Sequence, residues 1–359
     1  MTTQTVSPSA PARPRAAGLR ARWVVLCFAL LLLAVVAGVA VGPVSLPLQN
    51  VALSLVNHIP GVDVDTGLSD TQNAIIWKLR LPRVVLALLV GAMLSMAGGC
   101  YQGVFRNPLA DPMLLGVAAG AGLGATFFII ARAHGAKLDP HLLPLASFLG
   151  GIVALTATYL LGTSGGKRRR GTVTLVLAGV AVSSFLTAVQ TFVQQRNIDT
   201  IESVYSWLLG RISLADWQDV YLLLPYAAVT AVVVLIRRRE LDVLSVGDDE
   251  ASALGLHPQS VRLILLAVAS LATAAAVSVS GLIGFVGIVV PHIVRLLAGR
   301  SYRSILPLSM LVGAIFLIVA DLAARTVVAP AELPIGVVTA FVGAPFFVLV
   351  MRTSHEASP

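Results

Sequence analysis

Long apolar runs with few charges constrain this chain more than any other feature of its sequence. About 20 apolar residues are enough to cross the hydrocarbon core of a bilayer as a helix. Ten such runs lie at residues 23–42, 84–99, 113–131, 142–162, 173–193, 220–236, 261–279, 283–298, 304–324 and 334–351. Only 12% of the 359 residues are charged, about half the usual share. The sequence therefore predicts an all-α integral membrane protein with ten transmembrane helices.

Positive charge is distributed unevenly between the two sides of this topology. With the N-terminus inside, seventeen of the 25 Lys and Arg residues fall on the cytoplasmic side and eight fall outside. Cytoplasmic loops carry such an excess, so we expect both termini in the cytoplasm. The basic runs 167–170 and 237–239 adjoin predicted spans. They are interpreted as topology anchors, and the net charge of +8 then needs no nucleic-acid partner.

Both ends of the chain differ from the ten-span region. Residues 1–22 are rich in Pro, Ala and Arg, which predicts a disordered cytoplasmic tail. The run that starts at residue 23 is too long for the apolar part of a signal peptide, so a retained span is favoured over a cleaved signal. We expect the ten-span domain to cover residues 23–352, followed by a short cytoplasmic tail at 353–359.

Small and helix-breaking residues predict how the spans pack and where they are interrupted. Gly91, Ser95 and Gly99 recur every four residues, a spacing that lets helix backbones approach closely in lipid. The stretch "RNPLADP" at 106–112 contains two prolines, which end helices. The glycines of 281–287 also interrupt an apolar run, which is typical of broken helices near a transport path. Residues 194–218 predict an amphipathic helix in the outer interface.

Residue patterns that support enzymatic chemistry are absent from the sequence. There is no HxxxH, HExxH or CxxC spacing, and "GTSGGKRRR" departs from the phosphate-binding GxxxxGK[ST] pattern. We therefore expect no catalytic residue, no metal site and no cofactor on this chain. Asp321 and Glu332 lie towards the outer ends of their spans, with Arg325 near Asp321. Ion-coupled secondary transporters usually carry such groups at mid-bilayer, so this function is a remote alternative.

The segment 241–256, "LDVLSVGDDEASALGL", predicts a short cytoplasmic helix. Ser245 can cap it, the acidic residues 248–250 suit its first turn, and Gly255 can end it. Such a helix would expose Ala251, Ala253 and Leu254 to a partner protein. An ordinary solvated loop explains the same pattern equally well.

Five motifs in the same order resemble the FecCD-type permeases of ABC importers. They are "LRLPRVVLALLVGAMLSMAG" (79–98), "QGVFRNPLADPMLLGVAAGAGLGA" (102–125), "LDVLSVGDDEASALGL" (241–256), "GFVGIVVPHIVRLLAG" (284–299) and "APAELPIGVVTAFVGAPFFVLV" (329–350). The resemblance implies the type II importer permease fold in a bacterial cytoplasmic membrane. It also implies a second permease copy, two ATPase subunits that bind ATP and Mg, and an extracytoplasmic substrate-binding protein.

Residue roles follow from the resemblance, position by position. The coupling helix at about 241–256 would contact the ATPase through Gly247, Asp248, Glu250, Ala253, Leu254 and Gly255. The binding protein would dock on Arg80, Arg83 and Arg325. A cytoplasmic gate would use Asn107, Leu109 and Thr172, and Gln190, Gln194 and Thr339 would line the translocation path. Ferric siderophore is the expected substrate because it is the family's commonest, with haem or cobalamin as alternatives.

Overall fold

The computed structural model describes residues 21–42, 46–58, 61, 64–164, 172–210 and 212–356, and their regular structure is helical throughout. In the first half the helices are α1 (Ala21–Ala40), α2 (Leu48–Asn57), α3 (Asp70–Ile75), η1 (Ile76–Arg80), α4 (Leu81–Phe105), η2 (Pro112–Leu115), α5 (Val117–Ala133), η3 (Pro140–Leu142), α6 (Leu143–Thr163) and α7 (Thr172–Gln195). In the second half they are η5 (Ile198–Thr200), α8 (Ile201–Leu208), α9 (Trp217–Leu244), α10 (Asp248–Ala253), α11 (Pro258–Ser280), α12 (Val286–Ala298), α13 (Tyr302–Thr326) and α14 (Ile335–Glu356).

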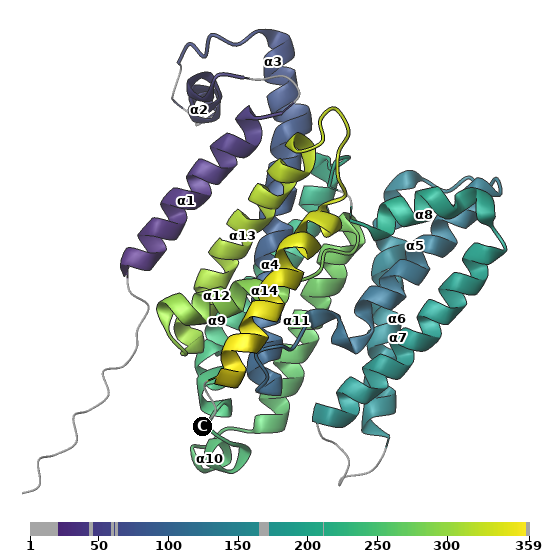
Figure 1. The fold of residues 1–359 in the computed structure, drawn as a ribbon, viewed down its shortest axis with the longest axis vertical. Helices are drawn as coiled ribbons and strands as arrows, with labels where there is room; N and C mark the ends of the chain where they lie inside the picture. The colour runs from purple at the N-terminus through teal and green to yellow at the C-terminus, as the bar shows by residue number, and fades with distance from the viewer. Residues whose placement is uncertain are drawn as a thin grey trace, which may run out of the picture.

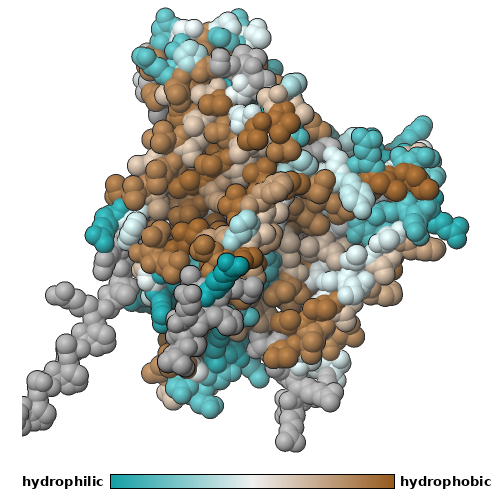
Figure 2. All heavy atoms as spheres, viewed as in Figure 1, coloured by the Kyte–Doolittle hydropathy of each residue, from teal (hydrophilic) through white to brown (hydrophobic). Residues whose placement is uncertain are grey.

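Each of the ten predicted apolar runs coincides with one of these helices. Seven helical stretches in the described part of the chain are long and apolar enough to cross a membrane. The other three runs fall on the shorter helices α5, α12 and α14. Figure 2 shows a broad apolar band around the body of the molecule, with hydrophilic residues gathered at its two ends. The all-α membrane fold is confirmed, whereas the number of ten crossings stays a prediction.

The helices form two groups that lie side by side (Figure 1). The larger group surrounds α4, which packs against α13, α11, α9 and α12. The smaller group contains α5, α6 and α7 and is joined to the first through η2 and α11. Helices α2 and α8 lie at one end of the molecule, here called the α8 end, and α10 lies at the opposite α10 end (Figure 1).

Small residues bring helix backbones into direct contact, as the four-residue spacing predicts. A Cβ built at Gly91 would overlap the carbonyl oxygen of Gly313 in α13. The Ser95 hydroxyl donates to the carbonyl of Ser309, 2.7 Å away. In the smaller group, a Cβ at Gly120 would overlap the carbonyl oxygen of Gly150. Close backbone contact of this kind gives strong van der Waals packing where the lipid offers no hydrophobic driving force.

The predicted break between the seventh and eighth apolar runs is confirmed. Helix α11 ends at Ser280 and α12 begins at Val286, and the chain between them is not helical. Gly281 and Phe285 have φ angles of 70° and 69°, which no helix contains. Gln102 of α4 donates to the carbonyls of Gly287 and Ile288, at 3.2 and 3.4 Å. Buried backbone at this break is therefore packed against protein, as the interior of a membrane demands.

The terminal helices extend slightly beyond the bounds predicted for the ten-span domain. Helix α1 begins at Ala21, and α14 continues to Glu356. Residues 1–20, 357–359 and the basic run 167–170 lie outside the described residues. In the 194–218 segment, α8 is the expected short helix, but its Trp207 is buried. The α8 helix thus packs Trp207 against protein and not into the interface.

The contact between α4 and α13 predicts that Gly91→Ala destabilises the protein. Alanine favours a helix over glycine by at most about 1 kcal/mol, whereas overpacking a tight contact costs roughly 1–3 kcal/mol. Thermal unfolding of the detergent-solubilised chain should therefore begin at a lower temperature. Gly284→Ala is the matched control, because nothing lies within 4 Å of a Cβ at that position. An unchanged midpoint for Gly91→Ala would contradict the close contact.

Candidate coupling, gate and docking sites

The predicted segment 241–256 forms a short helix at the α10 end, and its start differs from the prediction. Helix α9 extends to Leu244, and Gly247, not Ser245, precedes the first residue of α10. Gly255 has a φ of 84° and ends the helix as expected. Leu254 is 71% exposed, whereas Ala251 is fully buried, which corrects its predicted exposure. The surface that α10 presents to a partner contains Glu250, Ala253 and Leu254.

Asp248 fixes α10 to two other helices. Arg262 of α11 donates two hydrogen bonds to its carboxylate, at 2.5 and 2.7 Å. Arg106, the residue after α4, also forms an ion pair with it and donates to the carbonyl of Leu244, 2.7 Å away. Hydrogen bonds from Arg262, with the charges of both arginines, hold the pKa of Asp248 below its usual value. Asp248 therefore stays charged at neutral pH and keeps α10 attached.

The predicted gate loop, residues 107–111, begins directly after Arg106, whose φ of 50° turns the chain out of α4. The Asn107 side chain accepts a hydrogen bond from the Leu109 amide at 2.9 Å. Asp111 accepts one from the Met113 amide at 2.7 Å and so caps η2. The loop is thus a built turn, with Asn107 exposed and Leu109 half-buried. Thr172 is the first residue of α7, and its side chain lies outside the described residues.

A cluster of charged residues lies at the α8 end, where docking was predicted. Arg83 pairs with Asp321 of α13 at 2.8 Å and with Glu332 of the α13–α14 loop at 3.0 Å. Arg325 lies 3.5 Å from the other oxygen of Asp321. These contacts join the four charged residues in one network of ion pairs. Asp321 is buried and ion-paired rather than extended towards water.

Two of the three docking arginines are buried at the end of α1. Arg80 donates to the carbonyls of Val39 and Ala40, both at 2.8 Å, and is 6% exposed. Arg325 donates to the carbonyl of Gly38 at 2.6 Å and is 4% exposed. These carbonyls are the unpaired acceptors that every helix leaves at its C-terminus. In this conformation, therefore, Arg80 and Arg325 stabilise α1 and offer a partner almost no surface.

Two of the three predicted path residues are buried inside the protomer, and the third is half-buried. Gln190 is buried and donates to the Thr126 hydroxyl at 3.0 Å, which joins α7 to α5. Thr339 is fully buried and donates to the Gly336 carbonyl. Gln194 is half-buried, and its side-chain nitrogen lacks a partner among the described residues. Burial of Gln190 and Thr339 gives no support to a lining role in this conformation.

Sequence reasoning missed the role of Arg262, which lies inside a predicted span. A positive charge one turn after the start of α11 was counted only as a topology marker. Asp242 was also missed, although it accepts hydrogen bonds from Ser301 and the Tyr302 amide and so ties α9 to α13. The sequence signal for both roles was a charged residue near the end of an apolar run. Among the described residues no cluster of His, Cys, Asp or Glu could hold a metal ion.

Comparison with known proteins places this arrangement in a family. The model of the FecCD transport family matches residues 30–353. The uncharacterized ABC transporter permease protein YvrB of Bacillus subtilis is 39% identical over 330 residues, which cover 92% of this chain and 93% of that protein. The cobalamin import system permease protein BtuC of Halobacterium salinarum is 41% identical, over 80% of this chain and 75% of that protein.

A solved structure agrees with these relatives. An ABC transporter of the metal-chelate type, in an inward-facing conformation, matches with a TM-score of 0.80 and 29% identity, and the match covers 93% of this chain and all of the other. These relatives are permease subunits, which carry no catalytic site, and ATP hydrolysis takes place on a separate subunit. The chain, an all-α membrane protein with α10 fixed to Arg106 through Asp248, belongs to the FecCD transport family of ABC importer permeases.

Proposed function

We propose that this permease moves a ferric siderophore from a binding protein to the cytoplasm by alternating access. Three relatives support an iron chelate. The Bacillus subtilis proteins FhuB and YfmD are named for iron(3+)-hydroxamate and Fe(3+)-citrate import, with 39% and 37% identity to this chain. HmuU of Yersinia pestis, named for hemin transport, is 36% identical. With the cobalamin permease, these relatives make haem and cobalamin the alternative substrates.

The substrate is tested by uptake into proteoliposomes that contain the permease, its ATPase and its binding protein. Radiolabelled ferric hydroxamate, hemin and cyanocobalamin are compared with and without ATP. We expect ATP-dependent accumulation of the ferric hydroxamate alone. Accumulation of hemin or cyanocobalamin instead would reassign the substrate. Uptake driven by an ion gradient without ATP would overturn the importer and favour the ion-coupled alternative.

The single observation that carries the mechanism is the ion pair between Asp248 of α10 and Arg106, which begins the gate loop. An ATPase that moves α10 would pull on Arg106, and the next residue is Asn107. The same carboxylate binds Arg262, so α11 and the interrupted chain before α12 would move with it. We assign coupling to Gly247, Asp248, Glu250, Ala253, Leu254 and Gly255, and the gate to Asn107, Leu109 and Thr172. Coupling and gating then share one rigid connection.

Replacing Leu254 by Asp should uncouple the permease from its ATPase. The exposed leucine would bury apolar surface in the partner, and a charge there opposes that burial. We expect less ATPase to co-purify and substrate uptake to fall roughly tenfold or more. Leu214→Asp is the matched control, since Leu214 is 68% exposed and lies beyond α8. Normal co-purification and uptake with Leu254→Asp would remove α10 from the coupling site.

Docking of the binding protein is proposed at the α8 end, but the exposed contact is Glu332 rather than the three arginines. Glu332 is the exposed member of the charged cluster, and Arg83 holds it in place. Arg80 and Arg325 hold α1 beside α4 and α13 and so stabilise this surface without forming part of it. Charges at the rim of such a surface raise the association rate more than the final affinity. The three arginines therefore contribute to docking mainly by holding Glu332 and α1 in place.

Arg325→Gln tests whether Arg325 has a structural role, because this change should then destabilise the permease even when no binding protein is present. Removing one member of a buried ion pair costs on the order of 3 kcal/mol, so the thermal unfolding midpoint should fall. Arg196→Gln removes the same charge from an exposed arginine that only contacts the Phe192 ring. We expect no change for this control. A normal midpoint with weakened docking would instead make Arg325 a direct contact.

The assembly is proposed to contain two copies of the permease, two ATPases and one binding protein. The α10 end then faces the cytoplasm, with both chain termini on that side, in a bacterial cytoplasmic membrane. Gln190, Gln194 and Thr339 would reach the path between the two copies only after α7 or α14 rearranges, because Gln190 and Thr339 are buried in the protomer.

A further inference from the structure

A cavity of about 840 Å³ lies between the two helix groups, near the α10 end. Such a volume falls within the roughly 300–1,000 Å³ range of small-molecule sites. One wall is the last part of α6 with Leu175 of α7, and the other is the first half of α11. The lining includes Leu175 of α7 but none of the proposed path residues Gln190, Gln194 and Thr339.

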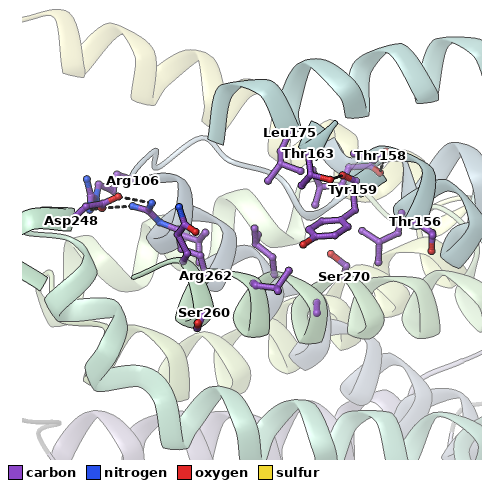
Figure 3. A pocket seen from close by; sticks show the side chains of 17 residues that line it. Arg106, Thr156, Thr158, Tyr159, Thr163, Leu175, Asp248, Ser260, Arg262 and Ser270 are labelled. Carbon is purple, nitrogen blue, oxygen red and sulfur yellow. Dashed lines mark hydrogen bonds and ion pairs between the residues drawn. The ribbon is translucent and has the colours of Figure 1, made fainter. Parts of the chain in front are cut away.

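The walls of this cavity are mainly apolar. Leu155, Leu175, Leu263 and Leu266 line it, and Tyr159 points into it from α6 (Figure 3). Leu263 is 46% exposed and Tyr159 is 41% exposed, so apolar side chains of both walls are accessible from outside the protein.

Positive charge lies at one end of the cavity. Figure 3 shows Arg106, Asp248 and Arg262 together there, apart from the polar side chains Thr156 and Thr158. Two guanidinium groups share one carboxylate, which leaves an excess of one positive charge. The Nε atom of Arg262 is buried and has no hydrogen-bond partner among the described residues. The first turn of α11 adds to this potential, because no side chain caps it and Gln259 and Ser260 also line the cavity.

We propose that this cavity binds an anionic phospholipid. The phosphate of its headgroup meets Arg262 and Arg106, and an acyl chain occupies the apolar space between α6 and α11. Charge complementarity selects the headgroup, because a zwitterionic headgroup brings no net charge, whereas an anionic one offsets the excess positive charge of the two arginines. The arginines lie at one end of the cavity with the apolar walls beyond them, which matches the charged headgroup and the acyl chain of a lipid.

A lipid site is distinct from the proposed transport function, yet it uses the two arginines that hold α10. Arg106 and Arg262 hold Asp248 of α10, so a bound phosphate shares these donors with the carboxylate. Lipid at this site therefore stabilises the two arginines where α10 is fixed. Binding itself depends on neither ATP nor the transported substrate, so it can be measured whether or not the proposed function is correct.

The test uses the full chain in phosphatidylcholine nanodiscs with a trace of photoreactive phosphatidylglycerol, whose diazirine lies on the acyl chain. After illumination, cross-linked peptides are mapped by mass spectrometry. We expect cross-links at residues 155–163 and 259–270, and few with photoreactive phosphatidylcholine of the same chain. Equal labelling by both lipids would show ordinary boundary lipid and overturn the proposal. Loss of labelling in excess inorganic phosphate would overturn it too, in favour of a soluble anion.

Two variants separate the headgroup from the acyl chain. Arg262→Gln should reduce phosphatidylglycerol labelling roughly tenfold, because it removes a charged donor, and Arg239→Gln, an exposed arginine outside the cavity, should not. Ala267→Phe fills the apolar space without touching the ion pairs and should reduce labelling to the phosphatidylcholine level. Because Ala267→Phe keeps Asp248 bound, full labelling in this variant would refute the site even if Arg262→Gln misfolds.

Discussion

The close approach of backbones to α4 is the constraint on which the rest of the structure depends. Of its 25 residues, 20 are buried, and glycines contact α13 on one side and α12 on another. Gly98 lies so near Gly287 that neither position has room for a side chain. A central helix with small residues lets several helices reach it together. The residues proposed for coupling and docking thus lie on elements that adjoin α4 or its neighbours.

Polar side chains donate hydrogen bonds to backbone carbonyls at places where the helices end or are interrupted. Arg80 and Arg325 cap the end of α1, Arg106 caps the end of α9, and Gln102 binds carbonyls at the start of α12. An unpaired carbonyl in a lipid interior costs several kcal/mol, so these contacts are required wherever the chain leaves a helix. These side chains come from η1, α4, the residue after α4, and α13, and they connect those elements to α1, α9 and α12.

The sequence was informative where the physics is local. Apolar length located the helices, the spacing of Gly91 and Ser95 predicted a close helix contact without naming α13 as the partner, and Gly255 located the end of α10. It was uninformative where the outcome depends on a partner far along the chain. Arg80 reads as an exposed residue beside a span until the end of α1, about 40 residues earlier, lies against it. Ala251 likewise reads as exposed on a six-residue helix, and only the fold shows that it faces α9 and α11.

The capping of α1 has a consequence for how the protein is made. Its terminal carbonyls accept hydrogen bonds from Arg80, which follows soon in synthesis, and from Arg325, which follows 287 residues after Gly38. The ribosome therefore delivers α1 to the membrane long before its last partner exists. During that interval α1 can contact α2, η1 and α4 but lacks α13, and the Gly38 carbonyl lacks its Arg325 donor. Shortened chains that stop before α13 should consequently be recognised by quality-control proteases through a loosely held first helix.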